Sequence, residues 1–139
     1  MKILVTGAKG FVGKNLCAQL NNIKYGKAKW YKVPADDLTI YEYDIDSDPD
    51  ELEVYCKNAD FVFNLAGINR PQDPKEFMEG NFGFASTLLD TLRKHGNTCP
   101  VMLSSSIQAT LIGRYDSDYG RSKRAGEDLF FTYGEETGA

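Results

Sequence analysis

Three regularly spaced glycines follow an apolar run at the start of the chain, and they limit its fold more than any other feature. The run Ile3–Val5 leads into the sequence TGAKGFVG, in which Gly7, Gly10 and Gly13 recur at every third position. Each ordered glycine costs backbone entropy, so three of them imply a geometric requirement. From Phe11 onward, apolar residues recur at helical spacing. The first 22 residues are therefore predicted to form a strand, a glycine turn and a helix.

Each glycine has its own expected role in such a unit. Gly7 allows the tight turn out of the strand, Gly10 lets the backbone approach a pyrophosphate, and Gly13 lets the helix pack closely on the sheet. Phosphates would then lie over the helix N-terminus, where free N–H groups and the helix dipole favour an anion. A glycine-rich turn without a ligand is the alternative interpretation, because the glycine pattern alone is weak evidence for binding.

Strands and helices are expected to alternate along the rest of the chain. The expected strands cover residues 2–6, 39–43, 61–65 and 101–105, and the expected helices cover residues 11–22, 50–58, 76–95 and 122–134. The stretch between residues 24 and 37 is expected to be an irregular insertion. The alternation predicts an α/β fold: a Rossmann-type, doubly wound parallel sheet with helices on both faces.

Composition excludes several classes of function. The 139 residues carry a net charge of -4, which argues against a general nucleic-acid binder. No apolar run approaches the roughly 18 residues that a membrane span needs, and the N-terminus lacks the features of a signal peptide, so a cytoplasmic protein is expected. The widely spaced Cys17, Cys56 and Cys99 indicate reduced, mostly buried thiols and no metal site.

Four motifs occur in the order typical of one enzyme family. The glycine turn resembles the TGxxGFxG motif of the extended short-chain dehydrogenase/reductase, or NAD-dependent epimerase/dehydratase, family. Residues 64–67 (NLAG) resemble its strand-end motif beside the adenine ribose, residues 104–106 its serines, and residues 119–123 its YxxxK motif. The resemblance covers nearly the whole chain and implies an oxidoreductase that uses a nicotinamide dinucleotide.

The resemblance implies a catalytic group of Tyr119, Lys123 and Ser106. In the family, the tyrosine transfers a proton to or from the substrate oxygen, the lysine lowers the pKa of the tyrosine and binds the nicotinamide ribose, and the serine holds the substrate oxygen. Ser105 is the second choice for that serine. Two residues four apart on a helix can face the same way, and a nearby cation favours the phenolate. From the YxxxK spacing alone, an ordinary surface pair would be the preferred interpretation.

The expected cofactor site combines the glycine turn with the ends of the other strands. Its residues are Gly7, Lys9, Gly10, Phe11, Val12, Gly13, Asp44, Leu65, Ala66, Gly67, Ser104 and Lys123. Arg70 either meets a sugar or phosphate anion or is a solvated loop residue. Asn81 either orders the site or is an ordinary helix residue. Together with Ser105, these two are the substrate-binding candidates.

The residues give mixed indications of which nicotinamide cofactor is used. An acidic residue at the end of the second strand hydrogen-bonds the ribose 2′-hydroxyl and repels a 2′-phosphate, so Asp44 favours NAD(H). Asp44 is also part of an acidic turn, which is the alternative interpretation, and the cation of Lys9 would suit a 2′-phosphate. The closer resemblance described next implies NADP(H).

Three longer stretches resemble the reductase part of the capsular polysaccharide enzymes of the UDP-N-acetyl-L-fucosamine pathway. They are GAKGFVGKNL, LAGINRP and SSSIQAT. Those enzymes reduce the 4-keto group of a UDP-linked 2-acetamido-2,6-dideoxy-hexulose with NADPH. The chain differs in its longer insertion, in Asp118 where a proline commonly precedes the tyrosine, and in Ile45 where a basic residue is common.

Extended members of the family are much longer than this chain. Residues 1–139 are therefore expected to be an N-terminal, cofactor-binding portion that lacks the substrate part and has weak or no turnover alone. The alternatives are a nucleotide-sugar 4-epimerase or dehydratase of the same family, or a non-catalytic nicotinamide-binding module. By analogy with the family, a homodimer is expected through the helices over 76–95 and 119–134.

Overall fold

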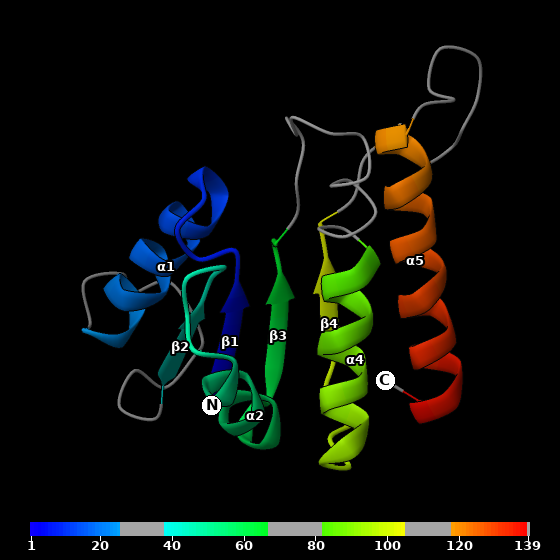
Figure 1. The fold of residues 1–139 in the computed structure, drawn as a ribbon. Coiled ribbons are helices and arrows are strands. Elements are labelled where there is room, and N and C mark those ends of the chain that lie inside the picture. Colours follow the sequence, from blue (N-terminus) through cyan, green and yellow to red (C-terminus); the bar gives the residue numbers. More distant parts are fainter. Residues whose placement is uncertain (26–37, 67–81, 105–117, 139) are drawn as a thin grey trace.

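A four-stranded parallel sheet forms the centre of the protein, as the sequence predicts (Figure 1). The computed structural model describes residues 1–25, 38–66, 82–104 and 118–138, with only the backbone for 118 and 119. The strands are β1 (Lys2–Thr6), β2 (Thr39–Tyr43), β3 (Phe61–Asn64) and β4 (Val101–Leu103), in the order β2-β1-β3-β4. The helices are α1 (Phe11–Lys24), α2 (Pro49–Asn58), α4 (Phe84–Lys94) and α5 (Asp118–Thr137).

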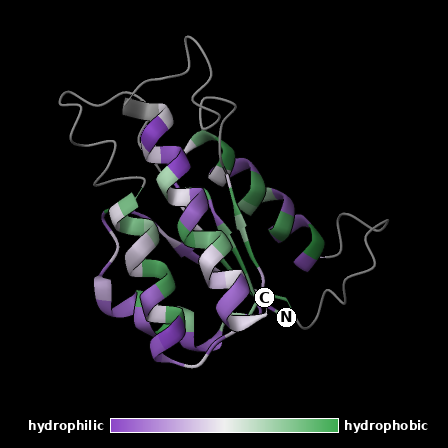
Figure 2. Cartoon of the chain, turned by 90° about the vertical axis from the view of Figure 1, so that its right-hand side faces the viewer, coloured by the Kyte–Doolittle hydropathy of each residue, from purple (hydrophilic) through white to green (hydrophobic). Residues whose placement is uncertain are grey.

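Helices cover both faces of the sheet. Alternate residues of a strand point to opposite faces, and the central strands carry apolar residues on both of them. In β1, Ile3 and Val5 pack in one cluster with Cys17 and Leu20 of α1, whereas Leu4 belongs to the cluster on the other face. The turned view shows the strands between α1 and the remaining helices, with apolar residues concentrated on the strands (Figure 2). This burial on both faces explains why β1 is a continuous apolar run.

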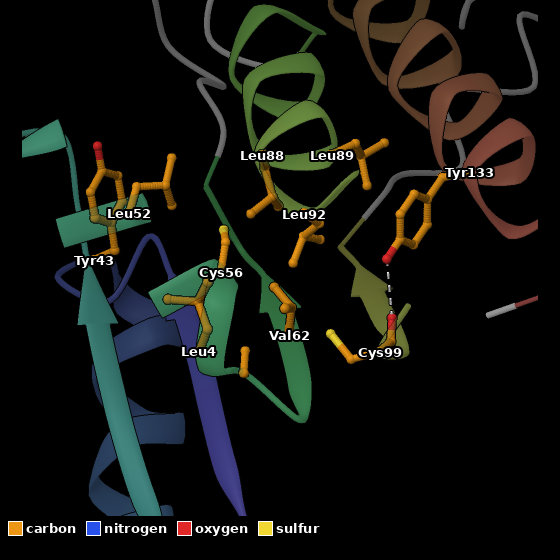
Figure 3. Close-up of a cluster of buried hydrophobic side chains, with 11 residues drawn as sticks. Leu4, Tyr43, Leu52, Cys56, Val62, Leu88, Leu89, Leu92, Cys99 and Tyr133 are labelled. Atoms are coloured by element: carbon orange, nitrogen blue, oxygen red, sulfur yellow. Dashed lines mark hydrogen bonds between the residues drawn. The ribbon is translucent and has the colours of Figure 1, made fainter. Parts of the chain in front are cut away.

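The larger core lies between the sheet and α2, α4 and α5. Leu88, Leu89 and Leu92 of α4 are fully buried. Leu88 and Leu92 point toward Cys56 of α2 and Val62 of β3, and Leu89 points toward Tyr133 of α5 (Figure 3). The spacing of the leucines follows the helical period, which places them on one face of α4. The three leucines thus form part of the hydrophobic core.

Two kinds of difference from the expected elements concern the site. The last helix begins at Asp118 rather than at residue 122, so the backbone of Tyr119 lies in the first turn of the same helix as Lys123. Strands β3 and β4 end at Asn64 and Leu103, before the expected residues 65 and 105. The described part of the expected helix over 76–95 is α4, which a π-helical turn at residues 82–83 precedes. Most of the expected insertion, residues 26–37, lies outside the described residues.

Asn97 joins α2 to the start of β4 with three hydrogen bonds. Its side-chain Nδ2 donates to the carbonyl oxygens of Cys56 at 2.7 Å and Ala59 at 2.8 Å, and its Oδ1 accepts from the backbone N–H of Cys99 at 2.9 Å. The hydroxyl of Tyr133 in α5 donates to the carbonyl of Asn97 at 2.9 Å. One side chain therefore helps to hold a helix end, a strand start and α5 in place.

We expect Asn97→Ala to lower the free energy of unfolding by about 2 kcal/mol or more, because two partly buried carbonyls and an N–H lose their partner. Urea denaturation measures this loss. Thr98→Ala is the matched control, since Thr98 is the exposed neighbour and its substitution should change stability by about 0.5 kcal/mol or less. Equal stability of the two variants would contradict the role given to Asn97.

Candidate functional site

The candidate site lies at the edge of the sheet where the four parallel strands end. Strand β1 pairs with β2 on one side and with β3 on the other, both parallel. The chain therefore moves outward from β1 in two opposite directions, and a doubly wound sheet binds its ligands in the crevice at such a switch point. The glycine turn connects β1 to α1 at this point.

Gly7 is required because the backbone turns into the left-handed region directly against the end of β3. Its φ is +68°, and a Cβ there would lie 2.7 Å from both the backbone nitrogen of Ala66 and the carbonyl carbon of Leu65. Side chains other than glycine are strained at such a φ. Gly7 therefore has the expected role of allowing a tight turn. It also has a second role, which is to let the backbone after β1 pass close to the backbone after β3.

Gly13 and Gly10 differ in what surrounds them. A Cβ at Gly13 would lie 2.1 Å from the carbonyl oxygen of Gly7 and 2.9 Å from the Cα of Ala8, both rigid backbone. Among the described residues, a Cβ at Gly10 would meet one atom within 4 Å, the Gly7 oxygen at 3.3 Å. The φ of Gly10 is −72°, which any residue can adopt. Packing against the described backbone therefore requires glycine at position 13 much more strictly than at position 10. At position 10, the close approach of a bound ligand would explain why the residue is glycine.

The N-terminus of α1 differs from that of α2 in a way that suits an anion. Helix α2 begins with Asp48, whose side chain accepts a 2.9 Å hydrogen bond from the N–H of Asp50, and its first turn carries two acidic residues. Helix α1 begins at Gly10 with no side-chain cap and no acidic residue in its first turn. Among the described residues, α1 therefore has no acidic side chain of its own at the positive end of its dipole, which is compatible with an anion bound there.

Asp44 braces the glycine turn from the end of β2. Its Oδ2 accepts from the backbone N–H of Lys9 and its Oδ1 from that of Ile45, both at 2.7 Å. The backbone N–H of Asp44 donates to the Ser47 hydroxyl at 3.0 Å. The sequence predicts an acidic residue at the end of this strand, and the structure places its carboxylate beside the turn.

Lys9 does not extend freely from the turn. Its ammonium forms an ion pair with the carboxylate of Asp46. This hydrogen bond raises the pKa of Lys9 and lowers that of Asp46 from their ordinary values. The sequence identifies Lys9 as a candidate partner of a 2′-phosphate, but it does not reveal this pairing.

A buried pair of polar side chains joins the ends of β1 and β3 beneath the glycine turn. The Thr6 hydroxyl donates to the Asn64 Oδ1 at 2.5 Å, and both residues are almost completely buried. The N–H of Ala66 donates to the Thr6 hydroxyl at 3.4 Å. This pair fixes Leu65 and Ala66 where they meet Gly7. Sequence reasoning identified residues 64–67 as a motif but missed the role of Thr6.

Lys123 lies at the end of β4, at the same edge of the sheet. Its Nζ donates to the carbonyl oxygen of Ser104 at 3.4 Å. Burial lowers the pKa of this lysine, because a low-dielectric setting disfavours the charged form. The helix places residue 119 one turn before Lys123.

Several predicted site residues lie outside the described residues. They are Gly67, Arg70, Asn81, Ser105 and Ser106, together with the side chain of Tyr119. The described members of the cofactor set come together at the ends of β1, β2 and β3 and at the start of α1, while Ser104 and Lys123 lie at the end of β4.

The cysteines contribute no chemistry to this site. All three are buried, as the sequence predicts, and burial raises the pKa of Cys17 and Cys56 to about 12 and that of Cys99 to about 11. Within the part of the chain that the structure describes, no group of His, Cys, Asp or Glu side chains could hold a metal ion. Among the same residues, no helix combines the length and the apolar character that crossing a membrane requires.

The sequence and the site define the class of protein. The family model described as "NAD dependent epimerase/dehydratase family" matches residues 3–139. The chain therefore belongs to the NAD-dependent epimerase/dehydratase family, as its motifs predict.

Two individual relatives are more similar to this chain than the family as a whole requires. The chain is 38% identical over 138 residues to a UDP-2-acetamido-2,6-beta-L-arabino-hexul-4-ose reductase of Pseudomonas aeruginosa, covering 99% of this chain and 33% of the relative. It is 41% identical to the crystal structure of the capsular polysaccharide assembling protein CapF from Staphylococcus aureus, with a TM-score of 0.73, covering 99% of this chain and 33% of the other. The chain thus spans about a third of the length of these two relatives.

A more distant structure shares the fold. A short-chain dehydrogenase/reductase superfamily protein from Agrobacterium tumefaciens, crystallised with bound NAD, superposes with a TM-score of 0.77 at 20% identity. The match covers 99% of this chain and 46% of that protein.

Gly10 and Gly13 should respond differently to a single added methyl group. Gly13→Ala should destabilise the protein by about 2 kcal/mol or more, because the methyl would overlap the Gly7 carbonyl and the backbone would have to move. Gly10→Ala should cost about 1 kcal/mol or less, since it only replaces one helix N-cap by a weaker one. Thermal and urea denaturation measure both values. A Gly13→Ala variant as stable as Gly10→Ala would show that the glycine turn does not pack as described.

Proposed function

We propose that this chain is the cofactor-binding part of an NAD(H)-dependent oxidoreductase that reduces the 4-keto group of a UDP-linked 2-acetamido-2,6-dideoxy-hexulose in the synthesis of a surface polysaccharide. The observation that carries the proposal is the site at the strand ends, where Gly10 and the uncapped N-terminus of α1 face the same sheet edge as Lys123. The identity to the Pseudomonas reductase and to CapF supports the choice of substrate class.

The residues present fit a dinucleotide. The pyrophosphate would be held by the N-terminus of α1, with its closest approach at Gly10. There the described residues place a single atom, the Gly7 oxygen at 3.3 Å, near the position of a Cβ. Exposed Phe11 and Val12 form the first turn of that helix, so their N–H groups are the donors at its positive end. Leu65 and Ala66 border the crevice opposite Gly7.

The catalytic roles are assigned to Tyr119, Lys123 and a serine of residues 104–106. When bound, the reduced nicotinamide supplies a hydride to the carbonyl carbon of the substrate. Tyr119 gives its phenolic proton to the carbonyl oxygen, and Lys123, one helical turn away, stabilises the phenolate that remains. Ser106, or Ser105, orients the substrate oxygen by a hydrogen bond. The partial burial of Lys123 strengthens its effect on the tyrosine, because water screens its charge less.

The charges at the end of β2 favour NAD(H) over NADP(H). Asp44 and Asp46 are both carboxylates, and Lys9 is already paired with one of them. A ribose 2′-phosphate would bring up to two further negative charges to this place, whereas a ribose hydroxyl can donate to a carboxylate. Ile45 offers no cation in return. The geometry thus supports NAD(H), although the resemblance to the capsular reductases implies NADP(H).

Calorimetric titration of the 139-residue chain with NADH and with NADPH tests the cofactor part of the proposal. We expect NADH to bind about tenfold or more tightly than NADPH, for the electrostatic reason just given. Gly10→Ala should weaken NADH binding by about tenfold, because the methyl occupies the space of the approaching phosphate, while the variant stays folded. Binding of neither nucleotide, or tighter binding of NADPH, would contradict this assignment.

The catalytic part is tested in a protein that carries this chain together with its substrate-binding part. Tyr119→Phe should lower kcat for reduction of the UDP-4-keto sugar by about 10²- to 10⁴-fold, because the proton donor is lost. Cofactor affinity should remain, since the ring is kept. Tyr25→Phe is the matched control, because Tyr25 is exposed and follows the end of α1 that lies away from the glycine turn. Loss of activity in both variants, or in neither, would overturn the role of Tyr119.

A further inference from the structure

We propose that Asp46 is a positioning residue that sets the preference between an unphosphorylated and a 2′-phosphorylated adenine ribose by holding the ammonium of Lys9. The inference rests on the dinucleotide site proposed above. It assigns part of the preference to a residue beyond the end of β2, in addition to the carboxylate at the strand end itself.

Lys9 is held at both of its ends by the segment that follows β2. Its backbone N–H donates to Asp44 Oδ2 at 2.7 Å, and its side-chain ammonium pairs with Asp46. The intervening residue, Ile45, donates its own N–H to Asp44 Oδ1 at 2.7 Å. The glycine turn and this segment are therefore linked by a lysine whose backbone and side chain both have acidic partners.

The double attachment determines what charge an incoming ribose substituent meets. The pairing keeps the pKa of Asp46 low and that of Lys9 high, so both groups are charged at neutral pH. With Asp44, the three side chains sum to a charge of −1. The cation that the glycine turn offers is thereby neutralised. Among the described residues beside the turn, a 2′-phosphate would then meet one carboxylate in excess.

The strength of the pair limits the size of the effect. The side chains of Lys9 and Asp46 are 65% and 59% exposed, and exposed ion pairs are weak. A ribose 2′-phosphate could therefore compete with Asp46 for Lys9. The ion pair then weakens the binding of the 2′-phosphorylated cofactor without excluding it. This effect should be largest at low ionic strength, where exposed charges are least screened.

The experiment measures dissociation constants of NAD⁺ and NADP⁺ by calorimetry at low salt for four proteins: the wild type, Asp46→Asn, Lys9→Gln and the double variant. We expect the ratio of the NADP⁺ to the NAD⁺ constant to fall about tenfold in Asp46→Asn, because one repelling charge is removed and Lys9 is released. In the double variant most of this gain should be lost, since no ammonium remains to meet the phosphate. Lys9→Gln alone should raise the ratio, because Asp44 and Asp46 then carry a charge of −2 with no lysine beside them.

A matched control separates this effect from a general change of surface charge. Asp90 is an exposed aspartate paired with Arg93 on α4 at 3.0 Å, so Asp90→Asn removes the same charge and breaks a similar pair elsewhere. Its ratio should equal that of the wild type. The ratio is informative because a purely structural change in the turn would weaken both nucleotides together.

Each contrary result has a distinct meaning. If the wild type binds NAD⁺ and Asp46→Asn leaves the ratio unchanged, the inference is overturned while the proposed function stands. If the double variant keeps the whole gain, Asp46 acts by its own charge and the role given to Lys9 is overturned. If the wild type binds neither nucleotide, the proposed cofactor site fails and the inference fails with it.

Discussion

The close contact between two backbone segments is the constraint on which the rest of the structure depends. Gly7 leaves β1 with a positive φ and passes against Leu65 and Ala66 at the end of β3, where no Cβ could fit. The buried pair of Thr6 and Asn64 locks the two strand ends directly beneath this contact. The start of α1 is thereby placed over the switch point of the sheet, which is where a doubly wound fold binds its ligand.

Further contacts hold the glycine turn and α5 in place, some at β2 and β4 and some at the opposite end of the strands. Asp44 ties the glycine turn sideways to β2, and Lys123 reaches the end of β4 from α5. At the opposite end of the strands, Asn97 and Tyr133 join α2, β4 and α5. The site is thus built on elements that are fixed at both ends, so the position of Lys123 depends on packing well away from the strand edge that carries the chemistry.

Much of this arrangement is readable from the sequence because it rests on local patterns. Apolar runs and helical spacing predict each strand and helix that the structure describes, and the glycine motif between strand and helix predicts where the site lies. Of the two expected starts of the last helix, residue 122 is four residues late, whereas residue 119, where the YxxxK motif begins, is within one residue of the observed start at Asp118. The pairing of Lys9 with Asp46 and the bonds of Asn97 link residues about 40 positions apart, and no local pattern encodes such contacts. The roles of Tyr119 and Ser106 remain predictions from the resemblance.

The unequal surroundings of the three glycines change how a motif of this kind should be interpreted in other sequences. A Cβ at Gly13 would overlap the backbone of Gly7, and a Cβ at Gly7 would overlap the residues that follow β3. The fold alone would therefore retain both glycines in a related protein that no longer binds a ligand. Within the part of the chain that the structure describes, a Cβ at Gly10 would have a single close neighbour, the Gly7 oxygen at 3.3 Å. In a set of related chains, a side chain at the middle position beside intact outer glycines would therefore mark the members that have kept the architecture and abandoned the ligand.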